Sequence, residues 1–452
     1  MELFYETLTR YDLTLEKLPK TLGSIGVSQL NAALEKLQLM IYKENRDISA
    51  RQDSLFNFVA NENICGGPSS CEEPECRLKR AQKLCEFSAL YADRVLVRNP
   101  IKPYLDRMRI EKLDDRIRTR LLGDFLVIWL FEPLLTDGLF QFAQSEHHFC
   151  TDCYKRYSSN EFFNYEERLE NVYSYLQNVL NSKVSVYAVN NTNGFHLQID
   201  GPEDIIEHQT QVIHFVYYIP QTLKKYLKNK GKYKLSRKEM EDIAIFKGLF
   251  NQNIEDFAVQ DWYTKNFDYT YLTNRSLDID LIRMVNGDDL NRTSEYFIDG
   301  LTHTIPALSN LSVTQLLKLR KQEGNAFEDY RNNLRRVIKE LKPKSASEVR
   351  EAFQEKVKPE IDKIQRKIKE RNKLLIKNLS IDAIIYTGIV TIGLFSGLLP
   401  ANIGTIVGAL GGIGFGHSLV KRLTNFVTVP GECRENPYFF LWKVKKRGTQ
   451  KH

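Results

Sequence analysis

The chain has 452 residues with a net charge of +7, 27% charged residues and a mean hydropathy of −0.38. This composition excludes a chain that lies mostly in a membrane, and the length allows two to four domains with cores of their own. The N-terminal segment is acidic and lacks the apolar core of a signal peptide. We therefore expect no secretion signal and a reducing compartment, in which the seven cysteines are thiols or metal ligands.

Residues 1–180 are expected to form an α-rich N-terminal domain with Cys/His loops. The first 60 residues are helical in pattern, and Ser28 is the expected N-cap of a helix whose apolar residues recur at spacings of three and four. A further helix is predicted for residues 76–91. The apolar positions of the first helix are Leu30, Leu34, Leu37 and Ile41.

A short strand is predicted for residues 94–99, where an Asn-Pro pair stops it. Residues 104–142 are again helical in pattern, and Leu121–Leu135 is apolar enough to be a buried helix. That run is too short for a membrane span and contains Asp124. We therefore assign it to the protein core.

The sharpest local motif is a C-x-x-C pair with a histidine just before it. Two thiolates at this spacing suit a tetrahedral Zn(II) ion, and the imidazole can be a third ligand. A second pair of cysteines lies in a Gly/Pro-rich loop near residue 70. The predicted ligands of a structural zinc are therefore Cys71, Cys76, Cys150, Cys153 and His148. Free cysteines or a redox role are the alternatives, and Cys85 is expected in the core.

Residues 181–310 are predicted to form an α+β domain. Its best-supported element is a β-hairpin, because residues 184–190 and 195–199 alternate around an Asn/Gly turn. The outward face of this hairpin would show Ser185, Tyr187 and His196 or their neighbours. Helices are predicted at 203–227 and 237–260, joined by a basic loop at 224–234.

Residues 311–378 are predicted to form a stalk of long amphipathic helices, with a capping box at Ser312–Gln315. Between Arg331 and Lys377 the chain has 16 Lys or Arg and 7 Asp or Glu, an excess of 9. This stretch lacks interleaved aromatic stacking residues, since its one aromatic residue, Phe353, belongs to an apolar stripe. It is therefore more simply a helix pair with a positive face than a nucleic-acid site. Nucleic acid is accordingly not expected among the partners.

Residues 379–422 are predicted to form a hydrophobic helical hairpin, because Ala383–Gly416 has no charged residue and is broken only at Pro400–Asn402. Each arm would span roughly 26 Å as a helix, slightly short of the roughly 30 Å hydrocarbon core of a bilayer. Glycines recur every four residues, which allows close helix packing in lipid. The packing residues are Gly393, Gly397, Gly404, Gly408, Gly412 and Gly416. The alternative is a hairpin buried by the other domains of a soluble protein.

Basic residues flank the hairpin on both sides, which predicts that both of its ends stay on the cytoplasmic side of a membrane. The flanking residues are Arg371, Lys373, Lys377, Lys421 and Arg422. The remaining segment, 423–452, is an aromatic and basic tail that suits a lipid headgroup interface. A short docked strand with a basic end is an equal alternative for this tail.

No phosphate-binding loop, zinc-protease helix or serine-hydrolase elbow is present in the sequence, so we do not expect an enzyme. A metal-dependent nuclease remains an alternative, since Asp278, Asp280, Asp288 and Asp289 could supply carboxylates. Three histidines, His196, His208 and His214, are expected to be core or surface residues.

The predicted fold is therefore mainly α with a small β-hairpin or sheet (α+β) body, followed by the stalk and the hairpin. In layout alone it is similar to bacterial toxins and antiphage defence effectors in which a sensing body controls a membrane-perturbing hairpin. We expect a cytoplasmic body attached to the inner face of a membrane, with a lipid bilayer, further copies of the chain or a regulatory protein as partners. The alternative is a soluble regulatory or protein-binding protein.

Overall fold

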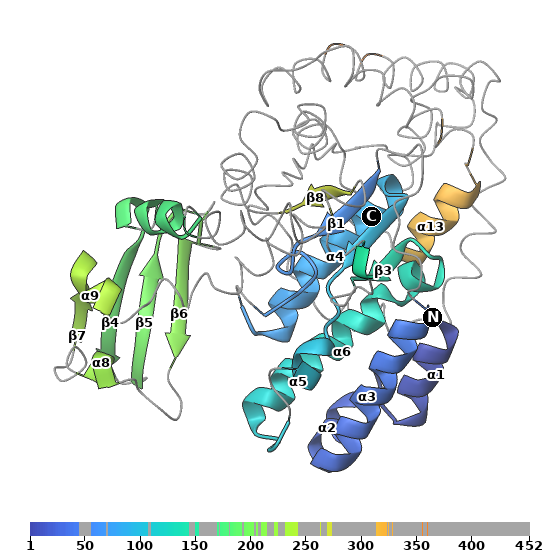
Figure 1. Cartoon of the computed structure of the whole chain (residues 1–452), viewed down its shortest axis with the longest axis horizontal. Helices are drawn as coiled ribbons and strands as arrows, with labels where there is room; N and C mark the ends of the chain where they lie inside the picture. Colours follow the sequence, from blue (N-terminus) through green and yellow to red (C-terminus); the bar gives the residue numbers. More distant parts are fainter. Residues whose placement is uncertain are drawn as a thin grey trace, which may run out of the picture.

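The structure is a computed structural model that describes residues 1–44, 56–68, 71–106, 110–143 and 150–152. It also describes parts of 170–242, residues 263, 269–273 and 313–322, and four isolated later positions. These residues form a mixed α/β structure with helices and two separate four-stranded sheets (Figure 1). The predicted hairpin, the tail and nearly all of the stalk lie outside the described residues.

The first sheet is entirely parallel, with strand order β3-β2-β1-β8. Helix α4 (Pro74–Tyr91) connects β1 to β2, and α6 (Asp115–Thr136) connects β2 to β3. The last strand comes from much later in the chain, so this sheet draws on both the predicted 1–180 and 181–310 domains. Its strands are β1 (Asn57–Ala60), β2 (Arg94–Val97), β3 (Phe140–Phe142) and β8 (Thr270–Leu272).

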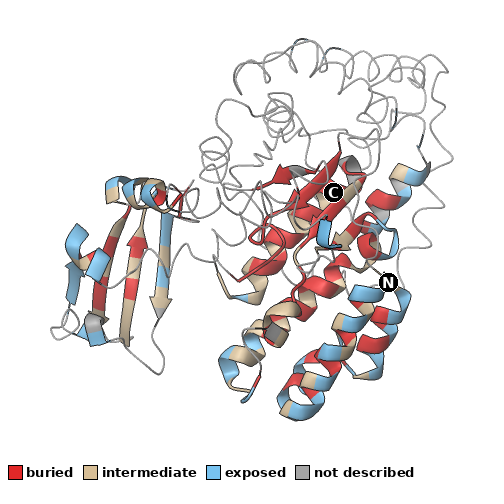
Figure 2. Ribbon diagram, in the orientation of Figure 1, coloured by how far each residue is buried: buried red, intermediate tan, exposed pale blue. Residues whose placement is uncertain are grey.

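Both faces of the parallel sheet are buried, as Figure 2 shows by its red strands. Alternate residues point to opposite faces, so Phe58 and Val95 join the large core formed with α4 and α6. Val59, Leu96 and Tyr271 join a smaller cluster on the other face. A strand buried on both sides has no alternating pattern. For this reason the sequence pattern at Asn57–Ala60 and Phe140–Phe142 gave a helix, which is wrong.

Four N-terminal elements pack against this body: α1 (Glu2–Arg10), α2 (Leu18–Ser24), α3 (Val27–Glu44) and α5 (Lys102–Asp106). The hydroxyl of Tyr5 donates to the carbonyl of Ile128 at 2.8 Å, and the indole of Trp129 donates to the carbonyl of Leu13 at 2.8 Å.

The apolar positions predicted for the α3 helix are all buried, which confirms that helix. The predicted N-cap at Ser28 is wrong, since α3 already begins at Val27 and the N–H of Leu30 donates to the carbonyl of Gly26 at 2.9 Å. The helices predicted at 76–91 and over Leu121–Leu135 are confirmed as α4 and α6, and the strand predicted at 94–99 is confirmed as β2.

The second sheet is antiparallel, with strand order β6-β5-β4-β7, and stands beside the parallel-sheet body in Figure 1. The predicted β-hairpin is confirmed as β4 and β5, which meet at Gly194 with a φ of +99°. The helix predicted at 203–227 is wrong at β6, because pairing with β5 holds these residues extended. The strands are β4 (Ser185–Asn191), β5 (Gly194–Asp200), β6 (Thr210–His214) and β7 (Gly231–Lys234). Two short helices, α8 (Gln221–Lys224) and α9 (Arg237–Asp242), flank β7.

The first helix of the predicted stalk, α13 (Val313–Gln322), packs on α4 and α6. Leu316 and Leu317 are buried there. The guanidinium of Arg320 donates to the carbonyl of Ala92 and lies 3.3 Å from the carboxylate of Asp93. Helix α13, at the start of the predicted stalk, therefore belongs to the α/β body. Within the part of the chain that the structure describes, no helix is long and apolar enough to span a membrane.

Replacing Leu316 by Ala tests whether α13 belongs to the core. We expect Leu316→Ala to lower the free energy of unfolding by about 2–5 kcal/mol, because a fully buried leucine is removed and leaves a cavity. Lys318→Ala, at an exposed position of the same helix, should change it by less than about 0.5 kcal/mol. Denaturant unfolding of both variants measures the difference. Equal effects would contradict the packing of α13.

The carboxyl of Glu86, on α4, makes the free energy of unfolding depend on pH. Burial raises its pKa from 4.5 to about 7, although a hydrogen bond from Gln82 and the charge of Lys83 act in the opposite direction. In the folded chain Glu86 keeps its proton up to about pH 7, whereas the unfolded chain releases it near pH 4.5. The unfolding free energy should therefore fall as pH rises through this window.

We expect Glu86→Gln to remove this pH dependence of the unfolding free energy. Relative to the parent chain, the variant should gain stability between about pH 4.5 and 7, by at most about 3 kcal/mol. Unfolding curves of both proteins, collected across this pH range, measure the gain. Stability profiles that stay parallel over the whole range would show that Glu86 titrates alike in the folded and unfolded chains.

Candidate functional site

Three strands of the parallel sheet end in polar residues at the same edge. β1 is followed by Asn61 and Glu62, β2 by Arg98 and Asn99, and β8 by Thr273. The strand order also changes direction here. From β1 the chain continues to β2 on one side, whereas β8 pairs with β1 on the other side. In open α/β sheets, ligands bind outside the carboxyl ends of the strands at such a reversal. This carboxyl edge is therefore the candidate site.

Asn61 joins the two strands at the reversal. Its side-chain amide donates to the hydroxyl of Thr273 at 2.8 Å, and its backbone N–H donates to the carbonyl of Leu272 at 2.9 Å. Its side-chain oxygen accepts from the N–H of Ile64 at 2.9 Å and begins the turn after β1. Asn61 is fully buried, so its bonds fix the end of β1 to the end of β8.

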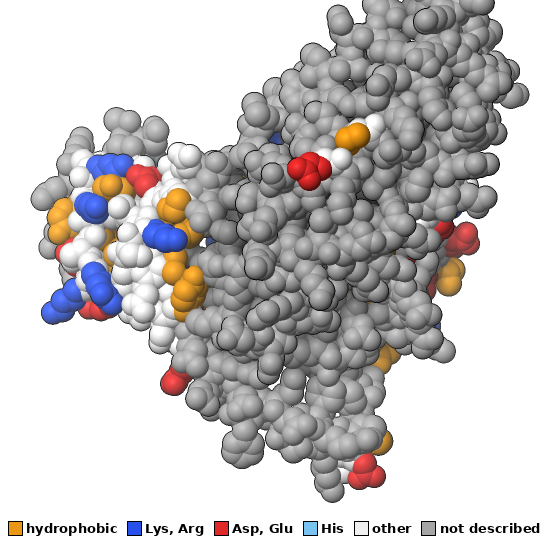
Figure 3. All heavy atoms as spheres, turned by 90° about the horizontal axis from the view of Figure 1, so that it is seen from above, with side chains coloured by type: hydrophobic (Ala, Val, Ile, Leu, Met, Phe, Trp, Pro, Cys, Tyr) orange, Lys and Arg blue, Asp and Glu red, His pale blue; other side chains and the backbone are white. Residues whose placement is uncertain are grey.

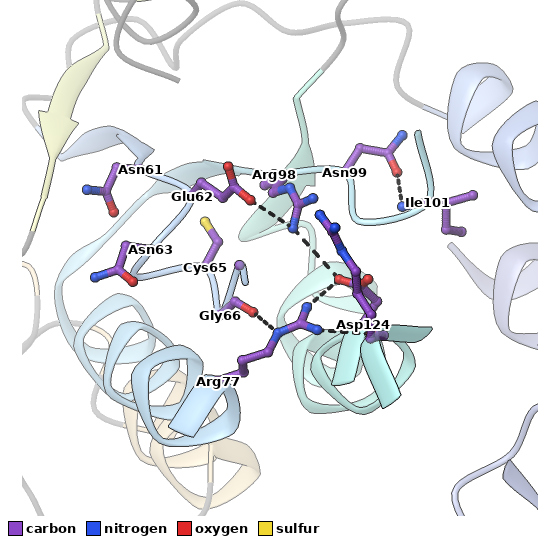
Figure 4. A network of polar contacts seen from close by, with 12 residues as sticks. Asn61, Glu62, Asn63, Cys65, Gly66, Arg77, Arg98, Asn99, Ile101 and Asp124 are labelled. Carbon is purple, nitrogen blue, oxygen red and sulfur yellow. Dashed lines mark hydrogen bonds and ion pairs between the residues drawn. The ribbon is translucent and has the colours of Figure 1, made fainter. Parts of the chain in front are cut away.

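A buried ionic network lies beside this junction (Figure 4). The guanidinium of Arg77, on α4, donates to the carboxylate of Asp124, on α6. Arg98 lies 3.7 Å from the same carboxylate and 3.2 Å from that of Glu62. Tyr104 donates its hydroxyl to the second oxygen of Asp124 at 2.5 Å. Two cations and two anions thus balance, as buried charges must.

The same arginines shape the loop after β1. Arg77 donates to the carbonyl of Gly66 at 2.6 Å. Arg80 donates to the carbonyls of Asn63 and Gly67, at 3.1 and 2.9 Å. These bonds give the carbonyls of Gly66 and Gly67 a donor and add a second donor to the carbonyl of Asn63, which also accepts from the N–H of Gly66. Two residues of α4, Arg77 and Arg80, therefore fix the loop 61–67 through its backbone carbonyls.

Glycine is required where the loop approaches these side chains. Gly66 has a φ of +75°, and a Cβ there would lie 2.8 Å from Val127. A Cβ on Gly67 would lie 2.7 Å from the carbonyl oxygen of Glu62, and one on Gly123 would lie 2.5 Å from the guanidinium of Arg77. These contacts are closer than side chains tolerate, so the three glycines allow the network to form.

The electrostatics of the edge disfavour a simple phosphate site. The N–H groups of Ile64, Cys65, Gly66 and Gly67 all donate within the loop. Glu73 and Glu75 lie at the start of α4, where an anion would otherwise bind the helix N-terminus. This loop therefore does not present the free N–H groups of a phosphate cradle.

The network also offers no catalytic pair among the described residues. Burial raises the pKa of Tyr104 far above its ordinary value, and the charge of Asp124 adds to this. Burial likewise raises the pKa of the Cys85 thiol, as expected for a core cysteine. A tyrosine and a thiol that hold their protons this tightly do not act as bases or nucleophiles at neutral pH. The edge is better suited to holding a defined surface than to chemistry.

The predicted zinc ligands are only partly described. Cys71 precedes α4, Cys76 lies in its first turn, and Cys150 is exposed. In the described ranges no group of three or more His, Cys, Asp or Glu side chains could hold a metal ion. His148 and Cys153 lie outside those ranges, so the zinc site stays a prediction.

All of the predicted membrane residues also lie outside the described part of the chain. These are the six glycines from Gly393 to Gly416 and the basic flanks from Arg371 to Arg422. The acidic positions considered for a nuclease, Asp278 to Asp289, lie outside it as well.

The sequence analysis did not identify the network at the carboxyl edge. One signal was available, because Asp124 interrupts an apolar helix and a buried carboxylate needs a cation. Its partners Arg77 and Arg98 lie 47 and 26 positions away, and only the strand order brings them together. Comparison with protein-family models, with curated proteins and with solved structures gives no match.

Removing the carboxylate of Asp124 should be costly. We expect Asp124→Ala to lower the free energy of unfolding by about 3–5 kcal/mol, because Arg77 would stay buried without its partner. The double variant Arg77→Met/Asp124→Leu should recover at least about 1 kcal/mol of this loss.

Denaturant unfolding measures both, with Asp115→Ala as the control on the same helix, exposed in its first turn and expected to cost less than about 1 kcal/mol. If the double variant loses the sum of the losses of Arg77→Met and Asp124→Leu measured alone, the pair is not coupled.

Proposed function

We propose that this protein is a membrane-associated effector in which a regulatory α/β body controls a hydrophobic hairpin. The observation that carries the proposal is the uncharged run Ala383–Gly416 with glycines four residues apart, in a chain that is otherwise polar. In lipid, such glycines allow two helices to approach closely and assemble copies of the chain. The protein acts by binding and conformational change and not as an enzyme.

The docking of α13 supports a link between body and hairpin. This helix begins the stalk that leads to the hairpin, and it packs on α4 and α6. The same two helices carry Arg77 and Asp124, which hold the loop at the carboxyl edge. A ligand or protein partner that moved this loop would act on helices that α13 contacts directly. The physical requirement for transmission is a contiguous set of packed elements with two arrangements.

A second candidate is a soluble regulatory protein whose hairpin is buried. The docked start of the stalk favours it too, since Leu316 is fully buried against the body. In that case the glycines would pack against protein and not against lipid. The two candidates differ in how the full chain leaves a membrane fraction.

We expect the full-length protein to sediment with membranes and to need detergent for extraction, because its hairpin is held by apolar contacts that high salt does not weaken.

Gly404→Leu should reduce leakage of dye from vesicles at least about tenfold while leaving the fold of the body unchanged, since it fills the packing face. Thr405→Leu, which adds an apolar side chain off that face, is the matched control. Extraction by salt alone would favour the soluble protein, and unchanged leakage by Gly404→Leu would exclude the glycine packing.

A further inference from the structure

The antiparallel sheet has one packed face and one open face. Val186 and Ala188 on β4, and Leu197 and Ile199 on β5, are at most 1% exposed and define the packed face. Tyr233 pairs with Ala188 and so belongs to that side, where its hydroxyl donates to Glu239 of α9. Helix α9 therefore lies over the packed face.

The strand register places a row of unlike side chains across the open face. Tyr187 on β4 pairs with Gln198 on β5 and with Lys234 on β7, and Gln198 pairs with Val212 on β6. Directly paired residues of an antiparallel sheet point to the same side. Val212 is 54% exposed and Lys234 is exposed, whereas Tyr187 and Gln198 are half-buried. An aromatic ring and an amide thus lie at the centre of a solvent-accessible sheet.

A lysine accompanies the ring. The Nζ of Lys232 lies 3.9 Å from the centroid of the Tyr187 ring. The same amine lies 3.7 Å from the carboxylate of Asp200, which also accepts from Gln198 at 2.8 Å and from Thr210 at 3.0 Å. The carboxylate of Asp200 is thus bonded to side chains of its own sheet. For Lys234, no ion pair is found among the described residues.

The segment that ends in β7 is rich in lysine. Residues 224–234 contain six lysines and no acidic residue. Two of these lysines, Lys232 and Lys234, stand on the open face by their register with Val189 and Tyr187. Figure 3 shows Lys and Arg side chains interspersed with hydrophobic ones on the described surface of this region.

We propose that the open face of the β4–β7 sheet binds single-stranded nucleic acid. A base would take the place of Lys232 on the ring of Tyr187, and the amine of Lys232, once displaced, would neutralise a phosphate beside Lys234. The NH2 of Gln198 is bonded to Asp200, so its amide oxygen would accept from the polar edge of the base. Proteins that bind single strands combine stacking rings on a sheet with a positively charged path for the backbone. A duplex hides the faces of its bases, so it cannot use the ring in this way. An acidic peptide would use the lysines but not the half-buried ring at the centre.

This proposal departs from the expectation that nucleic acid is not a partner. That expectation came from residues 331–377, where Phe353 is the one aromatic residue among the basic ones. On the open face one tyrosine of β4 lies beside two lysines of β7, which only the register reveals. The proposal does not depend on the membrane hairpin, since binding to the sheet needs no lipid.

Fluorescence anisotropy of the purified full-length chain with a labelled single strand of about 12 nucleotides tests the proposal. We expect Tyr187→Ala to weaken binding about tenfold or more and Tyr187→Phe to change it less than about twofold, because the ring is kept. Lys234→Gln should reduce the slope of log affinity against log salt by about 0.7, the value for one lost phosphate contact on a single strand.

Lys238→Gln is the charge-matched control, since Lys238 is exposed on α9 over the packed face, and it should leave both affinity and slope unchanged. The proposal is overturned if the parent chain does not bind the single strand at low salt, or if a duplex of the same length binds as tightly. Equal losses by Tyr187→Phe and Tyr187→Ala, or by Lys238→Gln and Lys234→Gln, would overturn it as well.

Discussion

The pairing of Arg77 with Asp124 inside the protein is the interaction on which the rest of the α/β body depends. Both charges are buried, so neither is tolerable without the other. The pair joins α4 to α6, and Arg77 also fixes the loop after β1 through the carbonyl of Gly66. The loop in turn positions Glu62 against Arg98 at the end of β2. One ion pair therefore connects two helices and two strand ends, and the glycines of the region are those that make room for it.

The carboxyl edge is held together by this arrangement. Its polar groups are mostly engaged with one another, and Asn61 uses both ends of its amide to join β1 and β8. A fully satisfied network specifies one geometry, whereas a half-satisfied one would cost stability. The edge is thus a point where the chain can register a change in neighbouring elements. Helix α13 packs on the same two helices, which makes the beginning of the stalk sensitive to their relative position.

The sequence allowed prediction of elements whose residues carry a strong local pattern. The alternating residues of β4 and β5 and the periodic leucines of α3 are examples, and both are confirmed. The strands of the parallel sheet have no such pattern, because burial on both faces removes the alternation. The pairing of β8 with β1 joins residues more than 200 positions apart, so no local signal reports it. For the same reason Asp124 was recognised as a break in an apolar helix but not as the partner of Arg77. The open face was partly anticipated through Ser185, Tyr187 and His196, whereas its lysines came from a strand that the sequence had suggested was a loop.

The order of the chain suggests how the two sheets could communicate. After β7 and α9 the chain returns to the parallel sheet as β8, and Thr273 at the end of β8 accepts from Asn61. Asn61 begins the loop that carries Glu62, and Glu62 pairs with Arg98 beside Asp124. A shift of β8 caused by an occupied β4–β7 sheet would therefore reach the network by the two hydrogen bonds from Asn61 to Leu272 and Thr273, and α13 by packing. A ligand moves such an equilibrium only by as much as it prefers one arrangement over the other. The buried ion pair contributes to the energy difference between the arrangements, because any arrangement that separates Arg77 from Asp124 costs several kcal/mol, while one that shifts α4 and α6 together does not. A signal that passes along this route must therefore move the two helices as one unit.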